Sequence, residues 1–361
     1  MYPGGERLEK GTGVGRPILI TGMARSGGSW VSRMVAGSGE VVHINEPFNR
    51  RHPPGLTPGI LDVPPPRAYQ YVGAHNEERY VAGFRDMLRL RYNFVAELRT
   101  NRGVYDLAKM AKYATVFSHG RARGRRPLVD DPYMVFAAEW MAERLDCQVV
   151  MLVRHPAGIV SSMARIGTGW SDNLPDIAAQ PELVRDHLAP YAAELERAAR
   201  EPFDPIAHGA LLWRLIHAGI ARQVERNPRF VVVRYEDLAA DPMNEFRKLY
   251  SRLDGVTFTR DAAETVRRGC LAEPAQRQVP WGRVGLGRTA FQPMQSGANA
   301  WAWRDRLTAE QAADVVARTR DVAERFYTPA ELEGGPGIAT AAAASTVPPR
   351  VRVTHRRWRS A

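Results

Sequence analysis

A glycine-rich stretch near the N-terminus has the residue types of a phosphate-binding loop. In "GMARSGGSW", Gly22, Gly27 and Ser29 match the pattern G-x-x-x-x-G-K-[ST]. The lysine of that pattern is absent, Gly28 occupies its place, and a different cation, Arg25, stands inside the loop. Glycines let backbone N–H groups point inward, and a following helix adds the positive end of its dipole. The stretch therefore predicts an anion site without the lysine that contacts a β/γ-phosphate pair.

A second arginine stands at the end of another apolar run, "VVMLVRHPAGIVSSMAR". Arg154 ends the predicted strand 148–156, and Ser162 follows about two helical turns into the next predicted helix. Enzymes that use nucleoside triphosphates hold Mg²⁺ with an aspartate near the loop. The sequence offers arginine at this strand end instead, which predicts a metal-free site for phosphate groups.

The elements that position these residues alternate along the chain. Short apolar runs predict strands, and amphipathic stretches between them predict helices. The predicted strands are 17–22, 40–48, 148–156 and 229–238. The predicted helices follow the loop and span most of 77–116, then 131–145, 157–166, 182–200, 206–226, 242–253 and 307–326, the last with a Thr308/Gln311 capping box. This alternation predicts an α/β domain with a mostly parallel sheet, whose ligands bind at the carboxyl ends of the strands.

Composition narrows the class of protein. The chain has 361 residues, a hydrophobic content of 44% and a net charge of +11, which favours a folded domain with an anionic partner. Two cysteines without metal-ligand spacing indicate a reducing compartment. Neither a signal peptide nor a membrane span is evident, so the sequence predicts a soluble, cytoplasmic protein. Residues 1–16 read as a flexible segment, and 329–361 as a disordered basic tail.

Four motifs give the chain a resemblance to a known family. They are "RSGGSW" (25–30), Arg154 with Ser162, "RYEDLAADPMNEF" (234–246) and "WRDRLTAEQ" (303–311). In this order they resemble the sulfotransferases that use 3′-phosphoadenosine 5′-phosphosulfate (PAPS). The resemblance covers about residues 17 to 328, and it implies one P-loop-like three-layer domain with a central, mostly parallel sheet flanked by helices. It also implies a PAPS co-substrate and no metal.

The family's roles carry over to matching residues. By resemblance, Arg25 would contact the sulfuryl group, Trp30 would stack on adenine and Tyr235 would lie near the base. The resemblance further assigns the 5′-phosphate to Ser26, Gly27, Gly28 and Ser29, and the 3′-phosphate to Arg154 and Ser162.

The sequence also departs from the family pattern. Gly28 replaces a hydroxyl residue, and Arg25 matches the carbohydrate-sulfating branch rather than the cytosolic branch, which has lysine. The family's late Arg-Lys-Gly contact to the 3′-phosphate is absent. Ser296-Gly297-Ala298 occupies its place, and Arg288 stands near enough in sequence to substitute.

The general base is predicted to be Glu46, in "HINEPFN" after the second strand. A carboxylate at a strand end beside an anion site can accept the acceptor's proton. The alternative bases are His43 and His119, and the alternative role for Glu46 is an ion pair with Arg50 or Arg51. By resemblance the reaction is in-line sulfuryl transfer to a hydroxyl or amine.

Two other functions fit parts of the sequence. A P-loop kinase would explain the glycine spacing but lacks the lysine and the acidic strand end, unless Glu236 and Asp237 serve. A nucleic-acid-binding protein would explain the charge, yet no recognition motif is present, so we expect no nucleic-acid partner. The expected acceptor is a carbohydrate, a glycolipid or another natural product, and the composition suggests a bacterial source. Residues expected at the acceptor mouth are Tyr69, Tyr71, His75 and Trp170.

Overall fold

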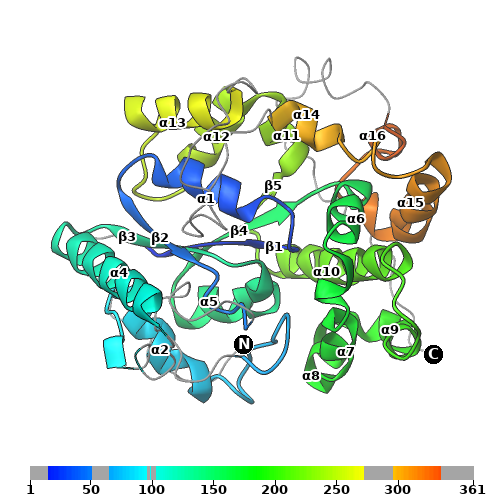
Figure 1. The fold of residues 1–361 in the computed structure, drawn as a ribbon, viewed down its shortest axis with the longest axis horizontal. Helices are drawn as coiled ribbons and strands as arrows, with labels where there is room; N and C mark the ends of the chain where they lie inside the picture. The colour runs from blue at the N-terminus through cyan, green and yellow to red at the C-terminus, as the bar shows by residue number, and fades with distance from the viewer. Residues whose placement is uncertain (1–14, 51–64, 96–97, 99–102, 272–295, 335–361) are drawn as a thin grey trace.

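A five-stranded parallel sheet forms the centre of the computed structural model, which describes residues 15–50, 65–95, 98, 103–271 and 296–334 (Figure 1). The strand order is β2-β3-β1-β4-β5, so β1 lies in the middle. The strands are β1 (Ile18–Gly22), β2 (Val41–Asn45), β3 (Arg126–Asp130), β4 (Gln148–Val153) and β5 (Val231–Arg234). Every neighbouring pair is parallel, which confirms the predicted three-layer α/β fold.

Helices cover both faces of the sheet, so its central strands are apolar on both sides. Along β1, Ile18 and Ile20 pack into one core cluster, and Leu19 packs into a second, larger one. The first cluster lies under α1 (Gly28–Ala36), α11 (Tyr235–Ala240), α12 (Pro242–Ser251), α13 (Arg260–Leu271) and α14 (Ser296–Trp301), as Figure 1 shows.

The second core cluster has the larger set of helices. They are α2 (Glu78–Leu88), α4 (Val104–Ala122), α5 (Ala138–Arg144), α6 (Pro156–Ala164), α7 (Asn173–Ala178), α8 (Pro181–Leu183), α9 (Ala192–Ala198), α10 (Ala207–Arg226), α15 (Ala309–Ala323) and α16 (Pro329–Leu332). Shorter 3-10 or π segments span Pro132–Ala137, Gly167–Trp170, Val184–Leu188 and Ala189–Tyr191. No helix in the described ranges has both the length and the apolarity to cross a bilayer.

The strand β3 is absent from the sequence prediction. It lies between β2 and β1, where Leu128 pairs with both His43 and Ile18. Its last residue, Asp130, and the following Asp131 bring acidic side chains to the carboxyl edge of the sheet, beside β1. An acidic strand end therefore adjoins the loop, contrary to the expectation from the sequence.

Other differences concern the ends of elements. The predicted strand 229–238 ends at Arg234, and Tyr235 begins α11. The predicted helix 131–145 begins as a 3-10 segment that Asp131 caps by accepting from the Tyr133 N–H. The capping box of Thr308 and Gln311 is confirmed at the start of α15.

The two ends of the chain were predicted to be flexible or disordered. Residues 1–14 and 335–361 lie outside the described residues. Arg16, which the sequence places in the flexible segment, pairs with Asp254 at 2.5 Å. Residues 329–332 form α16, with Leu332 fully buried, so the ordered chain continues past residue 328.

Candidate active site

The loop after β1 has the predicted strand–loop–helix context. Gly27 precedes α1 with a φ of 100°, a backbone conformation that favours glycine. A Cβ atom built on Gly27 would lie 2.7 Å from Cδ2 of Tyr235, so the packing of Tyr235 also requires a residue without a side chain at this position. Arg25 has a φ of 76°, an uncommon conformation for a residue with a side chain. Such conformations concentrate at functional sites, where surrounding structure holds them.

Asp130 explains why the loop has no lysine. A Cβ atom on Gly28 would lie 2.5 Å from Oδ1 of Asp130, so the carboxylate fills the space where a side chain at position 28 would begin. Asp130 is buried, and His43 Nε2 lies 3.5 Å from its other oxygen. The loop therefore presents backbone N–H groups and Arg25, rather than an ammonium group, to any anion.

The loop and the end of β4 meet at two hydrogen bonds. Nε of Arg25 donates to the Ser162 hydroxyl on α6 at 2.9 Å. Nη1 of Arg154 donates to the backbone carbonyl of Arg25, also at 2.9 Å. These contacts join residues more than 120 positions apart in sequence, so the fold brings three of the predicted anion-binding residues together.

Arg154 also contacts Tyr235, the residue that follows the end of β5. Its guanidinium lies 4.1 Å from the ring centroid of Tyr235, the first residue of α11, and Nη2 donates to the carbonyl of Asn299 at 3.1 Å. The Asn299 side chain in turn donates to the Tyr235 hydroxyl at 2.9 Å. Arg154 is only 6% exposed, and its Nε atom has no hydrogen-bond partner among the described residues. A buried cation with an unused donor is suited to binding an anion.

Positive charge accumulates around Arg25. Partial burial, and then the charges of Arg154, Arg165 and Arg306, lower the pKa of Arg25, whereas Glu46 opposes that shift. Burial also lowers the pKa of Arg306, and so do Arg165 and Arg154. Like charges that disfavour one another in the folded chain are relieved when a multivalent anion binds between them. Arg306 was not singled out from the sequence.

Two other predicted donor-site residues, Ser26 and Trp30, point inward. The Ser26 hydroxyl donates to the Met23 carbonyl at 2.6 Å, and the residue is buried. Trp30 is buried with its ring against Phe246 and Tyr235, at centroid distances of 5.5 and 5.2 Å. Both side chains thus contribute to packing, and their contacts with a donor stay predictions. Ser29, at the start of α1, is exposed.

Glu46 lies in the turn that follows β2. Its N–H donates to the Asp130 carbonyl at 2.6 Å, and its Oε2 accepts from the Asn49 side chain at 2.6 Å. Its φ of 44° is in the left-handed region. Arg50, one of the two predicted partners of Glu46, pairs instead with Asp172 and Asp176, both at 2.7 Å. Arg51 lies outside the described residues.

The Glu46 turn is anchored by Asp131, which the sequence analysis missed. Asp131 is fully buried and accepts from the N–H groups of Phe48, at 2.5 Å, and Tyr133, at 2.8 Å. Burial and the nearby Glu46 raise the pKa of Asp131 well above its usual value. On the other side of the turn, the Ala24 N–H of the loop donates to the Tyr69 hydroxyl at 3.3 Å.

The two histidines considered as bases occupy different places. His43 lies within β2, with its ring turned toward Asp130 under α1. His119 is exposed on α4, where Arg123 contacts its ring. Neither contacts Arg25 or Ser162 in the described structure, whereas Glu46 is a charged neighbour of Arg25.

The segment that stands in place of the absent Arg-Lys-Gly motif forms the start of α14. Ser296, Gly297 and Ala298 form its first turn, and Asn299 follows with its contacts to Arg154 and Tyr235. Arg288 lies outside the described residues. Among the described residues, no group of three His, Cys, Asp or Glu side chains could hold a metal ion.

Two hollows lie near this part of the molecule. A small pocket adjoins the Glu46 turn but is too narrow to hold a water molecule; it is lined by Phe48, Asn49, Arg50, Ala68, Tyr133 and Asn173. A larger groove of about 680 Å³ runs between α7 and α9 and includes Pro175, Val184, Leu195 and Arg200, but none of the predicted site residues. The small pocket is therefore the one that adjoins the candidate base.

Comparisons with solved structures find distant similarity. The sulfotransferase domain of an olefin synthase from Synechococcus PCC 7002 is 18% identical, with 90% of this chain and 100% of that chain covered and a TM-score of 0.42. A sulfotransferase domain from the curacin biosynthetic pathway is 15% identical over 87% and 98%, with a TM-score of 0.46. Sulfotransferase STF1 from Mycobacterium tuberculosis H37Rv is 15% identical over 70% and 71%, with a TM-score of 0.32.

The sequence itself matches a family model. No curated protein matches the chain. The model of the sulfotransferase family matches residues 17–260, which include the loop after β1, the Glu46 turn and the ends of β4 and β5. The match covers more than half of the chain, and the chain belongs to the sulfotransferase family.

Proposed function

We propose that this enzyme transfers a sulfuryl group from PAPS to a hydroxyl or amine of an acceptor. The observation that supports it most is that Arg25 lies within hydrogen-bond distance of both Ser162 and Arg154. A donor with a 5′-phosphosulfate and a 3′-phosphate needs cations at two points. The loop after β1 and the end of β4 supply one arginine each, with Tyr235 beside the second.

The residues would divide the work of the reaction. The N–H groups at the start of α1, with Arg25, would stabilise charge that develops on the leaving phosphate, and Arg154 with Ser162 would hold the 3′-phosphate. Glu46 would accept the acceptor's proton as the new bond forms between sulfur and the acceptor's oxygen or nitrogen. The bond from sulfur to the bridging oxygen breaks in the same in-line step, and adenosine 3′,5′-bisphosphate leaves with the electron pair.

The acceptor would enter beside the Glu46 turn. Tyr133, Asn173 and Arg50 lie beside that turn, and such a mixture of aromatic and polar groups suits contact with a sugar or another hydroxylated natural product. Glu46-Pro47 and Arg25 resemble the carbohydrate-sulfating branch, which favours a carbohydrate or glycolipid hydroxyl.

The alternative function is that of a small-molecule kinase. Asp130 and Asp131 support it, because they supply an acidic strand end that was not predicted from the sequence. Both oxygens of Asp131, however, accept backbone N–H groups. Asp130 occupies the space beside Gly28, and the lysine is still missing. These contacts favour the sulfotransferase reaction.

Calorimetric titration separates the two reactions. We expect adenosine 3′,5′-bisphosphate to bind without metal, and adenosine 5′-monophosphate to bind at least ~10-fold more weakly, because a charge-assisted contact contributes about 1.5–3 kcal/mol. Binding of ATP with Mg²⁺, without a preference for the 3′-phosphate, would establish a triphosphate site and overturn the proposal.

A further inference from the structure

The peptide group between Arg154 and His155 is held at both of its polar atoms by buried side chains. Nε1 of Trp213, on α10, donates to the Arg154 carbonyl at 2.9 Å. The His155 N–H donates to Oε1 of Glu236, on α11, at 2.9 Å. A peptide group is planar, so fixing both atoms fixes its orientation. The fixed peptide group thereby sets the direction in which the Arg154 side chain leaves the end of β4.

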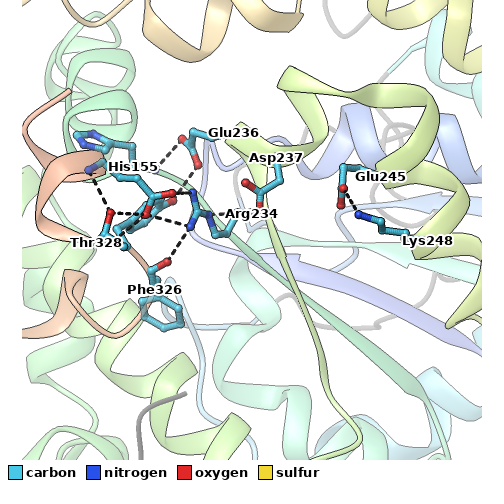
Figure 2. A network of polar contacts seen from close by, with 10 residues as sticks. His155, Arg234, Glu236, Asp237, Glu245, Lys248, Phe326 and Thr328 are labelled. Atoms are coloured by element: carbon cyan, nitrogen blue, oxygen red, sulfur yellow. Dashed lines mark hydrogen bonds and ion pairs between the residues drawn. The ribbon is translucent and has the colours of Figure 1, made fainter. Parts of the chain in front are cut away.

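Glu236 is itself held in place. It is 2% exposed, and its second oxygen accepts the hydroxyl of Tyr327 at 2.9 Å. Figure 2 shows its carboxylate facing His155 on one side and the chain that follows Phe326 on the other. A buried carboxylate costs several kcal/mol unless it is hydrogen-bonded, so two directional donors hold Glu236 in one position.

A second layer orients Tyr327. The guanidinium of Arg234 lies 4.6 Å from the Tyr327 ring centroid, and Nη1 donates to the Phe326 carbonyl at 3.2 Å. Arg234 also pairs with Glu331 at 2.6 Å, a contact that ties α16 to the end of β5. Figure 2 shows Arg234 between Glu236 and the Phe326 carbonyl. The support for Glu236 thus comes from two segments that are far apart in sequence.

We propose that Glu236 is a positioning residue for binding of the donor's 3′-phosphate, acting with Trp213 through the Arg154–His155 peptide. The inference rests on the proposed function, because it takes Arg154 as the 3′-phosphate contact. Glu236 directly follows Tyr235, so one carboxylate also fixes the start of α11 relative to the end of β4. The guanidinium of Arg154 and the ring of Tyr235 are thereby held in a fixed position relative to each other.

The test compares two ligands that differ only in the 3′-phosphate. The ratio of Kd for adenosine 5′-monophosphate to Kd for adenosine 3′,5′-bisphosphate isolates what that phosphate contributes. Glu236→Ala removes the acceptor for the His155 N–H, and Glu236→Gln keeps one. We expect the ratio to fall about 10-fold in the alanine variant and less than about 3-fold in the glutamine variant. The monophosphate Kd should change less than about 3-fold in both.

Two further variants test the same peptide by conservative changes. Trp213→Phe removes the donor to the Arg154 carbonyl and keeps an aromatic ring, and Tyr327→Phe removes the donor to Glu236. Both should lower the ratio about 3- to 10-fold. These variants keep the test available if Glu236→Ala does not fold. The matched control is Tyr250→Phe, because the Tyr250 hydroxyl is also buried but donates to the carbonyls of Met34 and Val35.

The possible failures are distinguishable. A wild-type ratio near one would mean that no 3′-phosphate site exists, which overturns the proposed function and this inference with it. A high wild-type ratio that Glu236→Ala and Trp213→Phe retain would overturn the inference alone. Equal weakening of both ligands would do the same, since it would show that Glu236 supports the fold rather than Arg154.

Discussion

The side chain of Arg25 donates from Nε to the hydroxyl of Ser162 at 2.9 Å, which joins the loop after β1 to the helix after β4. In the proposed reaction these two side chains contact opposite ends of one donor molecule. A donor that reaches both must replace this hydrogen bond with two contacts to anionic oxygens, which are the stronger kind. The hydrogen bond between Arg25 and Ser162 therefore lies where we expect the donor to bind.

Arg25 and Ser162 should have separable effects on the reaction. We expect Arg25→Ala to lower kcat about 10²- to 10³-fold, because it removes a charge that stabilises the leaving phosphate. Ser162→Ala should raise the Kd of adenosine 3′,5′-bisphosphate about 10-fold and leave kcat nearly unchanged. The measurements are steady-state kinetics and calorimetry.

The neighbouring Ser161 provides a control for Ser162. It is also buried on α6, but its hydroxyl donates to the Gly158 carbonyl at 3.2 Å. Ser161→Ala should leave the Kd of the bisphosphate within about 2-fold of wild type. Equal effects of the two serine variants would contradict a specific contact with the donor.

Glu46→Gln should lower kcat about 10²- to 10⁴-fold, the usual contribution of a general base, and leave the bisphosphate Kd within a few-fold. Glutamine keeps the oxygen that accepts from Asn49 but cannot take up a proton at neutral pH. Glu139→Gln is the control, since Glu139 is a partly buried carboxylate bonded to Arg226, outside the site. Full activity of Glu46→Gln would remove Glu46 as the base.

Gly28 and Asp130 should be energetically coupled. Gly28→Ala places a methyl group 2.5 Å from Asp130 Oδ1, so we expect the free energy of unfolding to fall by about 1–3 kcal/mol. Shortening the acid by Asp130→Ala should relieve most of that loss in the double variant. Urea unfolding of the four proteins gives the coupling energy. Strictly additive effects would show that the two side chains do not compete for the same space.

His217 should make the stability depend on pH. Burial lowers the pKa of His217 to about 3, against an unfolded value near 6.5. The unfolded chain therefore binds one more proton than the folded chain between these values, and stability is lost as the pH falls through that window. From pH 7.5 to 5.5 the loss from this histidine is about 1.4 kcal/mol.

Removing the imidazole tests this linkage. In His217→Gln, the decrease in unfolding free energy between pH 7.5 and 5.5 should be smaller than in wild type by that amount. Other ionisable groups contribute equally to both proteins and cancel in the difference. Parallel pH profiles for the two proteins would mean that His217 titrates in the folded state as it does in water.

The sequence predicts β1, its loop and α1 because three local signals agree. An apolar run, a set of glycines and a helical stripe ending at Gly37 follow one another over about twenty residues. The strand β3 escapes prediction because Arg126 and Pro127 interrupt its apolar pattern, and proline argues against a central strand. The structure tolerates Pro127 because β3 pairs with β1 only from Leu128 onward.

The site was predictable where function depends on residue type and not where it depends on long-range contacts. Arg25, Arg154 and Ser162 were identified from spacing, and the fold brings them together. Asp131 and Asn299 were missed because Asp131 contacts Phe48 after β2, and Asn299 of α14 contacts Tyr235 of α11; no local pattern in the sequence indicates these partners. The helical spacing of Trp30 predicts that its side chain faces inward, but it does not predict that the ring packs against both Tyr235 and Phe246.

The ring of His155 is enclosed by residues that lie beyond the family match. It is 1% exposed, stacked at 5.0 Å on Trp303, and its Nε2 lies 3.2 Å from the Leu332 carbonyl. Both partners lie beyond residue 260, where the family match stops. A fragment trimmed to the matched residues would uncover this ring beside Arg154, so the residues that enclose the proposed donor site extend about seventy positions past the end of the family match.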